Sequence, residues 1–309
     1  MIIKDDDDGQ RLDRFLKREF PQIGFGQTQK LIRTGQIRMD GKRVKSDARM
    51  VAGAELRLPP SLQDGKKKTQ VFFSQKDHDF ITSVIMYEDS DIIILNKPPR
   101  LAVQGGSKTI RHIDGMLNSY MKKGVKPRLV HRLDKDTSGV LILAKTADAA
   151  RALTKGFQDH TIQKTYWALT SPSPEIPNGT INAKLSKSIA RHDGGEMMVH
   201  DEENGKKSTT DYEILDKAGK DAAFVAFYPK TGRTHQIRVH AAIMGAPLLG
   251  DTKYNPEPHP FDNEDIHEGL HLHAREITFR HPTTKEIITA DAPLPDLFLK
   301  SWKTLGFNV

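Results

Sequence analysis

Residues 130–144 read VHRLDKDTSGVLILA, so a run of ionisable side chains stands directly before a run of apolar ones. The apolar run is typical of a buried strand. Arg132, Asp134 and Asp136 are each two residues apart, and in an extended chain they would point to the same side. A fold built around this strand must hold an arginine and two carboxylates next to its core, which makes the segment a candidate site.

Length and composition indicate a globular protein of two domains. The chain has 309 residues, of which 37% are hydrophobic and 28% are charged, and this length exceeds that of a typical single domain. The net charge is +7 and the pI is about 9.3. Such a balance favours a polyanionic partner, nucleic acid before a membrane, because Lys and Arg neutralise phosphates.

The absence of cysteine excludes disulfides, thiolate zinc sites and cysteine nucleophiles. It also suits the reducing cytoplasm, where we expect the protein to act. No apolar run approaches the roughly 18 residues of a membrane span. The first residues, MIIKDDDDGQ, lack the basic-then-apolar order of a signal peptide.

The first domain, predicted at residues 1–62, combines two short helices with strand-like pieces. RLDRFLKREF has apolar residues at helical spacing, and residues 27–33 form a second predicted helix. QIRMDGKRV and ELRLP are strand-like, and the first of them turns at its Asp-Gly pair. The basic residues of this unit are Arg11, Arg14, Lys17, Lys30, Arg33, Arg38, Lys42, Arg43 and Lys45. A charge run is usually a solvated face, but this concentration predicts one basic surface suited to a phosphate backbone.

Residues 63–80 are predicted to be a linker, because they lack clean periodicity and contain three consecutive lysines. Residues 81–309 form the predicted catalytic domain. Its strand-like runs are IIILNKP, VLILAKT, TYWALT, AAFVAFYP and HAREITFRHP, and its helix-compatible runs are ADAARALTKGFQ and RTHQIRVHAAIMG. Strands interspersed with helices, without strict alternation, predict an α+β domain.

Asp134 is the residue of HRLDKDTSG best suited to chemistry. Arginine and histidine neighbours favour the ionised form of a carboxyl group. An ionised aspartate in a dry pocket can attack an electrophilic carbon, including an anomeric one. Aspartate also commonly caps turns and helices, and the spacing alone leaves both roles open.

Two further segments carry candidate site residues. KTGRTHQIRVHAAIMG contains Arg233, His235 and Arg238, and the last two share a face if the segment is helical. Tyr166 lies in the strand-like QKTYWAL, where a buried tyrosine can stack on a base or act as an acid or base. A basic surface helix and a tyrosine that only packs remain the alternatives.

A histidine group near the end of the chain could bind a metal. Its members are His259, His267, His271 and His273. No carboxylate completes an obvious ligand spacing, so we predict no metal site.

Taken in order, these segments resemble the pseudouridine synthases of large-subunit ribosomal RNA. YEDSDIIILNKPPRLAVQGG is similar to the family's opening strand and loop, HRLDKDTSGVLILAK to its nucleophile motif and QKTYWAL to its tyrosine motif. GRTHQIRVH with GAPLLGDTKY is similar to its arginine motif and the turn after it, and LHLHAREITFRHPTTKE with APLP to its closing strands. RLDRFL, QKLIRTGQIRMDGKRV and ELRLP resemble an alpha-L RNA-binding domain. In the opening loop, Arg100 stands where the family more often has glycine.

The resemblance implies a mixed, largely antiparallel central sheet, a small N-terminal α/β RNA-binding domain, and isomerisation of uridine in 23S ribosomal RNA. It implies that Asp134 is the catalytic carboxylate, acting at C1′ or at C2′, and that Arg238 pairs with it. Tyr166 would stack on the uracil and help remove the C5 proton, and Arg132 would fill the gap left by the flipped nucleotide. RNA contacts would also come from His131, Arg233, His235, Arg33, Arg38, Lys42 and Arg43.

The resemblance implies no cofactor and no metal, because the reaction is neither an oxidation nor a transfer to a second molecule. The expected partner is 23S ribosomal RNA or its large-subunit precursor. We expect the protein to be a monomer and not to associate with a membrane. A glycosidase that releases free uracil and a non-catalytic RNA-binding protein stay open as alternatives. The expected role of Asp136 is structural, by hydrogen bonding to the Thr-Ser-Gly turn after it.

Overall fold

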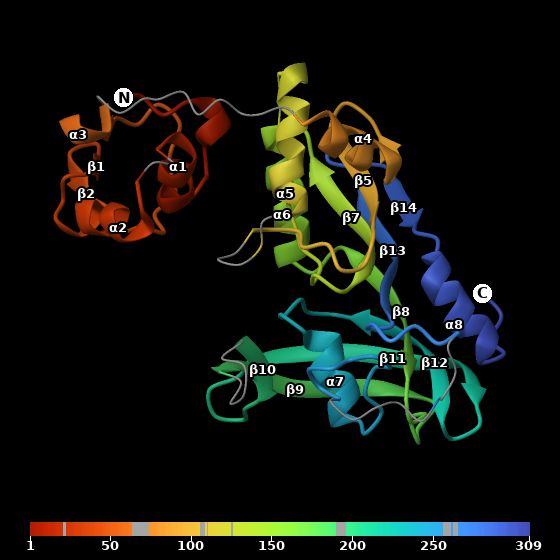
Figure 1. Ribbon diagram of the computed structural model, residues 1–309. Coiled ribbons are helices and arrows are strands. Elements are labelled where there is room, and N and C mark those ends of the chain that lie inside the picture. The colour runs from red at the N-terminus through yellow and green to blue at the C-terminus, as the bar shows by residue number, and fades with distance from the viewer. Residues whose placement is uncertain are drawn as a thin grey trace. The chain divides into compact units, whose positions relative to one another are not determined.

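The chain divides into two units, Met1–Phe72 and Phe73–Val309, each with its own hydrophobic core (Figure 1). The computed structural model describes residues 1–20, 23–63, 74–105, 109, 111–124, 126–189, 196–255, 261 and 265–309. Among these residues, no helix is both long enough and apolar enough to cross a membrane.

The first unit combines short helices with a small antiparallel sheet of strand order β2-β1-β3. Its elements are η1 (Asp5–Asp7), α1 (Leu12–Glu19), α2 (Phe25–Arg33), β1 (Arg38–Met39), β2 (Lys42–Arg43), β3 (Leu56–Arg57) and α3 (Pro60–Gln63). Leu12, Phe15 and Leu16 of α1 are buried. Asp40 and Gly41, with φ of 47° and 73°, turn the chain between β1 and β2. Both predicted helices and the predicted hairpin are confirmed.

The second unit is built on one large sheet of order β10-β9-β11-β12-β8-β13-β7-β5-β4, with β14 beside β13 and β6 beside β7. The strands are β4 (Ile85–Glu88), β5 (Ile92–Lys97), β6 (Arg128–Leu129), β7 (Ser138–Ala144), β8 (Gln163–Thr170), β9 (Asn178–Ile189), β10 (Glu196–His200), β11 (Lys206–Ala218), β12 (Ala222–Pro229), β13 (Leu272–Arg280) and β14 (Ile287–Asp291). In the described chain, the pair β7–β13 is parallel and the other strand pairs are antiparallel. The predicted α+β class, with a mixed and largely antiparallel sheet, is confirmed.

Helices cover both faces of this sheet (Figure 1). They are α4 (Gln75–Ser83), α5 (Ile113–Met116), η2 (Leu117–Lys123), α6 (Ala147–Gln158), α7 (Gln236–Ile243) and α8 (Asp296–Thr304). Ile93 and Leu141 pack in a core with α4, α5 and η2, whereas Ile94 and Ile142 pack in another core with α6. Strands β5 and β7 are thus buried on both faces, which explains their continuous apolar runs.

Helices also cover both faces of the part of the sheet formed by β8 and β12. Phe227 of β12 packs with Ile237 of α7 on one face, and Phe224 of the same strand packs with Trp302 of α8 on the other. Helix α7 therefore rests on a buried face close to the parallel strand pair. This packing brings the segment that contains His235 and Arg238 to the end of β7 where Asp134 lies.

The structure corrects the predicted linker at one end. Helix α4 begins at Gln75, and the side chain of Ser74 accepts a hydrogen bond from the backbone N–H of Asp77, as an N-cap does. Residues 75–80 are therefore helical, contrary to the linker prediction, while residues 64–73 lie outside the described chain. Strands β9, β10 and β11 were not predicted, because they lack the apolar runs of the central strands.

Candidate active site

The loop that carries Asp134 lies between β6 and β7, and close contacts with β13 hold its end. Gly139 has a φ of 106°, and a Cβ there would lie 2.2 Å from the carbonyl oxygen of Ala274. Only glycine fits this approach. The next contact joins Ser138 Oγ to Nδ1 of His273 at 2.8 Å. These contacts fix the start of β7 and so the position of the loop before it.

Lys97, at the end of β5, holds the same loop from the other side. Its side chain is fully buried. Nζ donates hydrogen bonds to three backbone carbonyls at 2.9, 2.7 and 3.1 Å, those of Pro98, Leu101 and Lys135. Burial lowers the pKa of Lys97 to about 7, although the charges of Asp136 and Asp134 act to raise it. The sequence analysis missed this residue, whose signal is a lysine that directly continues an apolar strand.

Asp134 faces His235 across a short gap. Oδ2 of Asp134 lies 3.8 Å from Nε2 of His235, and the two side chains are 20% and 16% exposed. This distance is longer than a hydrogen bond. His235 has a φ of 51° and immediately precedes α7. Burial lowers the pKa of His235, and the charge of Asp134 opposes this shift without reversing it, so the imidazole is neutral at neutral pH.

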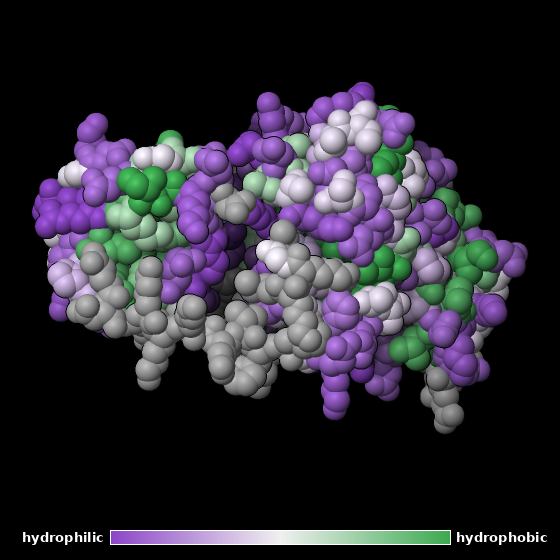
Figure 2. Space-filling model, turned by 90° about the horizontal axis from the view of Figure 1, so that it is seen from above, coloured by the Kyte–Doolittle hydropathy of each residue, from purple (hydrophilic) through white to green (hydrophobic). Residues whose placement is uncertain are grey.

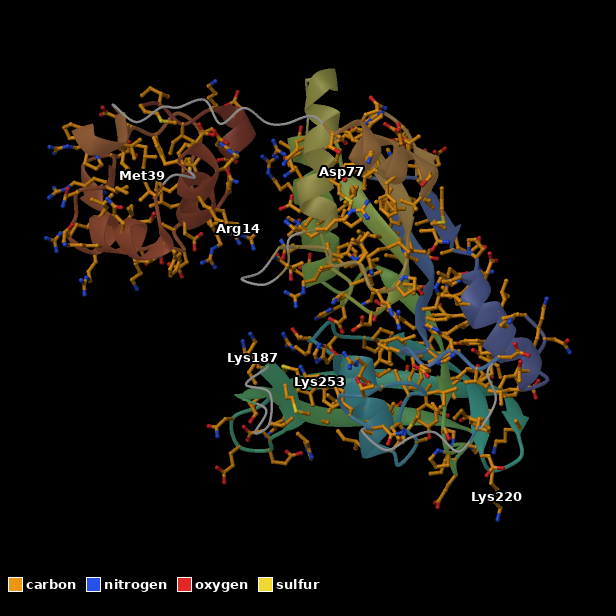
Figure 3. All side chains as sticks on the ribbon, viewed as in Figure 1. Arg14, Met39, Asp77, Lys187, Lys220 and Lys253 are labelled. Carbon is orange, nitrogen blue, oxygen red and sulfur yellow. The ribbon has the colours of Figure 1, made fainter. Side chains whose placement is uncertain are left out.

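Tyr254 determines which nitrogen of His235 carries the proton. Its Oη lies 2.8 Å from Nδ1 of His235 and accepts a hydrogen bond from the backbone N–H of Met198 at 3.0 Å. The hydroxyl proton is then satisfied by donation to Nδ1. This arrangement leaves the imidazole proton on Nε2, directed at the carboxylate of Asp134. Tyr254 belongs to the GDTKY segment, beside Lys253 (Figure 3), and was not predicted as a site residue.

Arg238 is paired differently from the prediction. Its Nε and Nη2 donate to the two carboxylate oxygens of Asp251 at 2.7 and 2.6 Å, and both side chains are buried. In the described chain no ion pair joins Arg238 to Asp134. The direct pair that the resemblance implies is absent from the described residues, because the guanidinium fork is occupied by a carboxylate 13 residues further along. The charge of Asp134 still acts on Arg238 and favours its charged form. The guanidinium also lies 5.1 Å from the centre of the Tyr254 ring.

Tyr166 lies on β8 between Phe227 of β12 and Ala274 of β13. Its ring packs at the border of two cores. Burial, and then the charge of Asp134, raises the pKa of Tyr166. The hydroxyl group therefore stays protonated at neutral pH, which disfavours a phenolate base at this position.

Comparisons with known proteins show the family of the chain. A family model described as RNA pseudouridylate synthase matches residues 91–242. The ribosomal large subunit pseudouridine synthase C of Escherichia coli O157:H7 is 34% identical over 301 residues, which cover 96% of this chain and 93% of that protein. The protein of the same description from Vibrio cholerae is 36% identical over 297 residues, with 94% and 92% covered. The chain belongs to the RNA pseudouridylate synthase family.

A solved structure supports the same assignment. Human RNA pseudouridylate synthase domain containing 4 matches with a TM-score of 0.62 and 27% identity, covering 75% of this chain and 96% of that one. The resemblance drawn from the motifs is therefore confirmed, and the protein is an RNA pseudouridine synthase.

The synthase presents two of its predicted RNA-contacting arginines at the surface. Arg132 is exposed two residues before Asp134, and Arg233 is exposed in the loop before α7, where its Nε donates to the carbonyl of Lys207 at 3.3 Å. Both remain available to a phosphate. Their roles stay predictions.

The predicted RNA contact of His131 stays a prediction, but the structure gives its ring other partners. Its Nε2 accepts a hydrogen bond from the backbone N–H of Ile142 at 2.8 Å, and its ring stacks on Phe157 with centroids 4.4 Å apart. Burial lowers the pKa of His131 to about 3. A neutral ring with this contact supports β7 and has no charge to offer a phosphate.

The basic residues predicted to bind RNA in the first unit differ in exposure and in hydrogen bonding. Arg33, Lys42 and Arg43 are exposed, and Arg14 projects outward from α1 (Figure 3). Arg38 is half-buried, and it donates from Nε and Nη1 to two backbone carbonyls at 3.0 and 3.2 Å, those of Gly35 and Gly41. Hydrophilic residues cover most of the face seen in Figure 2.

Asp136 does not act through the turn that follows it. Among the described residues it makes no hydrogen bond to residues 137–139, contrary to the expectation. Its charge acts instead on the buried ammonium group of Lys97.

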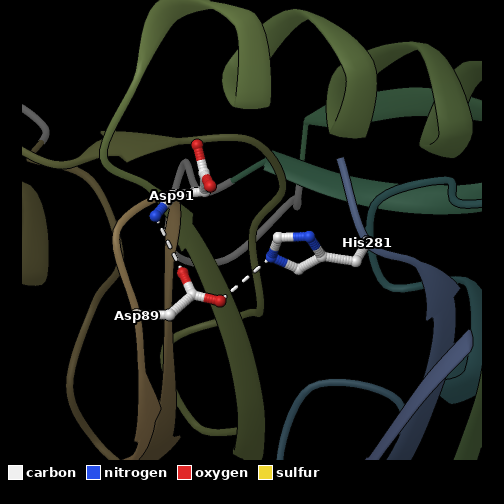
Figure 4. Close-up of side chains that lie close together, drawn as sticks. All are labelled: Asp89, Asp91 and His281. Atoms are coloured by element: carbon white, nitrogen blue, oxygen red, sulfur yellow. Dashed lines mark hydrogen bonds and ion pairs between the residues drawn. The ribbon is translucent and has the colours of Figure 1, made fainter. Parts of the chain in front are cut away.

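Two histidine-containing groups could in principle bind a metal. Of the group weighed from the sequence, His259 lies outside the described residues. His271 and His273 already engage both ring nitrogens with hydroxyl and carbonyl oxygens. A second group, Asp89, Asp91 and His281, has ligand atoms within 4.8 Å of one another (Figure 4).

In that second group the hydrogen bonds leave no nitrogen for a metal. Nδ1 of His281 accepts from the backbone N–H groups of Thr283 and Thr284 at 3.3 and 3.0 Å. The proton is therefore on Nε2, which donates to Asp89 at 3.0 Å. This donor set ties the end of β13 to the turn before β5, and we assign it a structural role.

Proposed function

We propose that this synthase converts uridine to pseudouridine at defined positions of large-subunit ribosomal RNA, with Asp134 as the catalytic carboxylate. The observation that carries the assignment is the position of Asp134. It is a partly exposed carboxylate on a loop held by Lys97 and β13, and it faces Nε2 of His235. Relatives named for the large ribosomal subunit support the choice of substrate.

The chemistry needs an ionised carboxylate and no co-reactant. The N1–C1′ bond breaks, the uracil turns, and C5 bonds to C1′, while C5 loses a proton and N1 gains one. Asp134 either attacks C1′ or removes the C2′ proton to give a glycal, and both routes require its charge. The Nε2–H of His235 stabilises this charge without an ion pair, and it comes within bonding distance if the gap closes on substrate binding.

Tyr166 is proposed to hold the uracil while it turns. Because the hydroxyl group stays protonated, the ring serves as a stacking surface and the hydroxyl as a donor. Removal of the C5 proton is then assigned to another group, and we propose Asp134, whose charge acts on Tyr166.

The target base must leave its stack to reach Asp134, at a cost of a few kcal/mol. Arg132 is proposed to occupy the space that the base leaves, since a guanidinium can stack on the exposed neighbours. Arg33, Lys42 and Arg43 of the first unit are proposed to bind RNA phosphates. We propose that the protein acts in the cytoplasm as a monomer.

Pseudouridine mapping tests this proposal. Ribosomal RNA from cells with and without the gene is compared site by site, and the purified protein is then incubated with the unmodified RNA. We expect specific positions to lose pseudouridine without the gene and to regain it in vitro, with no free uracil. Release of uracil would instead indicate a glycosidase, and an unchanged map would indicate a non-catalytic RNA-binding protein.

A further inference from the structure

Arg100 has a backbone conformation that arginine rarely adopts. Its φ is 62°, and it follows Pro99 in the turn that leaves β5. Proline at the second position and positive φ at the third are features of a type II turn, which favours glycine at the third position. A side chain there strains the backbone. The departure from glycine at this position therefore has an energetic cost.

The other non-glycine residues with positive φ have evident local roles. His160 directly follows the C-cap of helix α6, where a left-handed residue commonly ends a helix. Asp40 and Lys285 turn hairpins, and His235 faces Asp134. The ammonium group of Lys285 donates to the carbonyl of Pro282 within its own turn. Arg100 differs, because its side chain is exposed and makes no hydrogen bond or ion pair with another described residue. No contact within the described chain offsets its strain.

Lys97 joins the turn that contains Arg100 to the loop that carries Asp134, here called the catalytic loop. The carbonyls on both sides of Arg100, those of Pro98 and Leu101, accept hydrogen bonds from Lys97, which also bonds to the carbonyl of Lys135. Leu101 shares a core with Leu133 of the catalytic loop. The guanidinium group therefore projects from a rigid turn whose position is coupled to that of Asp134.

We propose that Arg100 binds a phosphate of the substrate RNA beside the flipped uridine and so positions the RNA for Asp134. A guanidinium group can bind two phosphate oxygens at once. Strained residues persist where the strain serves a functional contact. The inference rests on the proposed function, because it assumes an RNA substrate, and it adds a specific contact from the turn after β5.

The substitution Arg100→Gly separates strain from function. Glycine relieves the positive φ, so the melting temperature of the full-length protein should rise by about 2–4 °C. Affinity for an unmodified ribosomal RNA fragment should fall about fivefold to tenfold, and the plot of log K against log salt should become shallower by about 0.7, as for one lost phosphate contact. Higher stability together with weaker binding is the expected signature.

Three matched variants sharpen the test. Arg100→Asn tolerates positive φ without a charge and should bind as weakly as Arg100→Gly. Arg100→Lys keeps the charge but not the fork, so it should retain the salt slope with intermediate affinity. Lys285→Gly relieves the same strain at an exposed cation of the β13–β14 hairpin but also removes the hydrogen bond to Pro282, and it should leave RNA binding unchanged.

The possible outcomes lead to distinct conclusions. Unchanged affinity and salt slope in Arg100→Gly would overturn the inference. Weaker binding with an unchanged slope would overturn it as well, because the turn's shape and not a phosphate contact would then matter. The wild-type protein is assayed for pseudouridine formation on the same RNA, so absence of product there counts against the proposed function alone.

Discussion

Residues 1–72 carry 16 lysines and arginines against 10 aspartates and glutamates, whereas residues 73–309 carry 31 against 30. Almost all of the net charge of +7 therefore belongs to the first unit. Its Arg33, Lys42 and Arg43 are exposed, while Lys97 and Arg238 of the second unit are buried.

This difference shows two uses of charge. Exposed cations act over a distance and are screened by salt, so they contribute affinity that depends little on sequence or geometry. Buried charges are fixed by their hydrogen bonds, and their effects depend on position. The first unit is accordingly expected to set affinity and the second to set the rate.

Asp134→Asn should have the largest effect. The amide keeps the shape but loses the negative charge, so single-turnover release of tritium from 5-tritiated uridine in RNA should fall by at least about 10³-fold. RNA affinity should stay within about twofold, because no phosphate contact is lost. Asp136→Asn is the matched control and should keep most of the rate. Equal losses in both variants would contradict the division of roles.

Replacing Arg33, Lys42 and Arg43 together by glutamine tests the other side of the comparison. Affinity for ribosomal RNA at about 0.1 M salt should fall by roughly 100-fold, and the salt slope should become shallower by about 2. The single-turnover rate at saturating RNA should change by less than about twofold. Lys220→Gln, at an exposed lysine of the second unit, is the control. An unchanged slope would show that this basic surface does not touch RNA.

The pH dependence of the unfolding free energy in Lys97→Met tests the effect of a buried charge. Burial lowers the pKa of Lys97 from 10.5 to about 7, so between these values the unfolded chain holds a proton that the folded chain has released. Folded wild-type protein therefore gains stability over the variant as pH rises, by about 1 kcal/mol per pH unit. Urea unfolding at pH 7 and 9 should show the larger gap at pH 9. Lys220→Met should show a constant difference from the wild type.

Tyr254→Phe should have the smallest effect, a loss of about tenfold in single-turnover rate with unchanged RNA affinity, as for loss of a positioning hydrogen bond. Without the hydroxyl, the proton of His235 can move to Nδ1 and leave Nε2 bare toward Asp134. Protonation of His235 should partly restore the rate, because an imidazolium carries both protons. Since burial lowers the pKa of His235 from 6.5, this recovery is expected only as the pH falls below 6.5.

The charged groups around His235, namely Asp134, Arg238, Lys253 and Asp251, are shared by the variant and the wild type. A pH profile parallel to that of the wild type would therefore show that Tyr254 only supports the fold.

Several elements were predictable from local patterns. Helix α6 spans Ala147–Gln158, as its amphipathic spacing predicts, and Thr146 caps its first turn. The central strands β5 and β7 follow from continuous apolar runs. Strand β11 was missed, because more than half of its residues are polar or charged, and it forms through its pairing with β9 and β12. Such pairing depends on neighbours that are distant in sequence.

The sequence by itself determined the two-unit organisation of charge, because that depends on residue type alone. Local spacing left the role of Asp134 open, and the resemblance of the motifs to the pseudouridine synthases named it as the candidate carboxylate. Only the tertiary structure decided the partners. It placed His235 beside Asp134, which is 101 positions away in the chain, and it paired Arg238 with Asp251. It also buried Lys97, which donates a hydrogen bond to the loop that carries Asp134. Hydrogen bonds and burial act over a few ångströms, and distances of that kind exist only after the sheet has assembled.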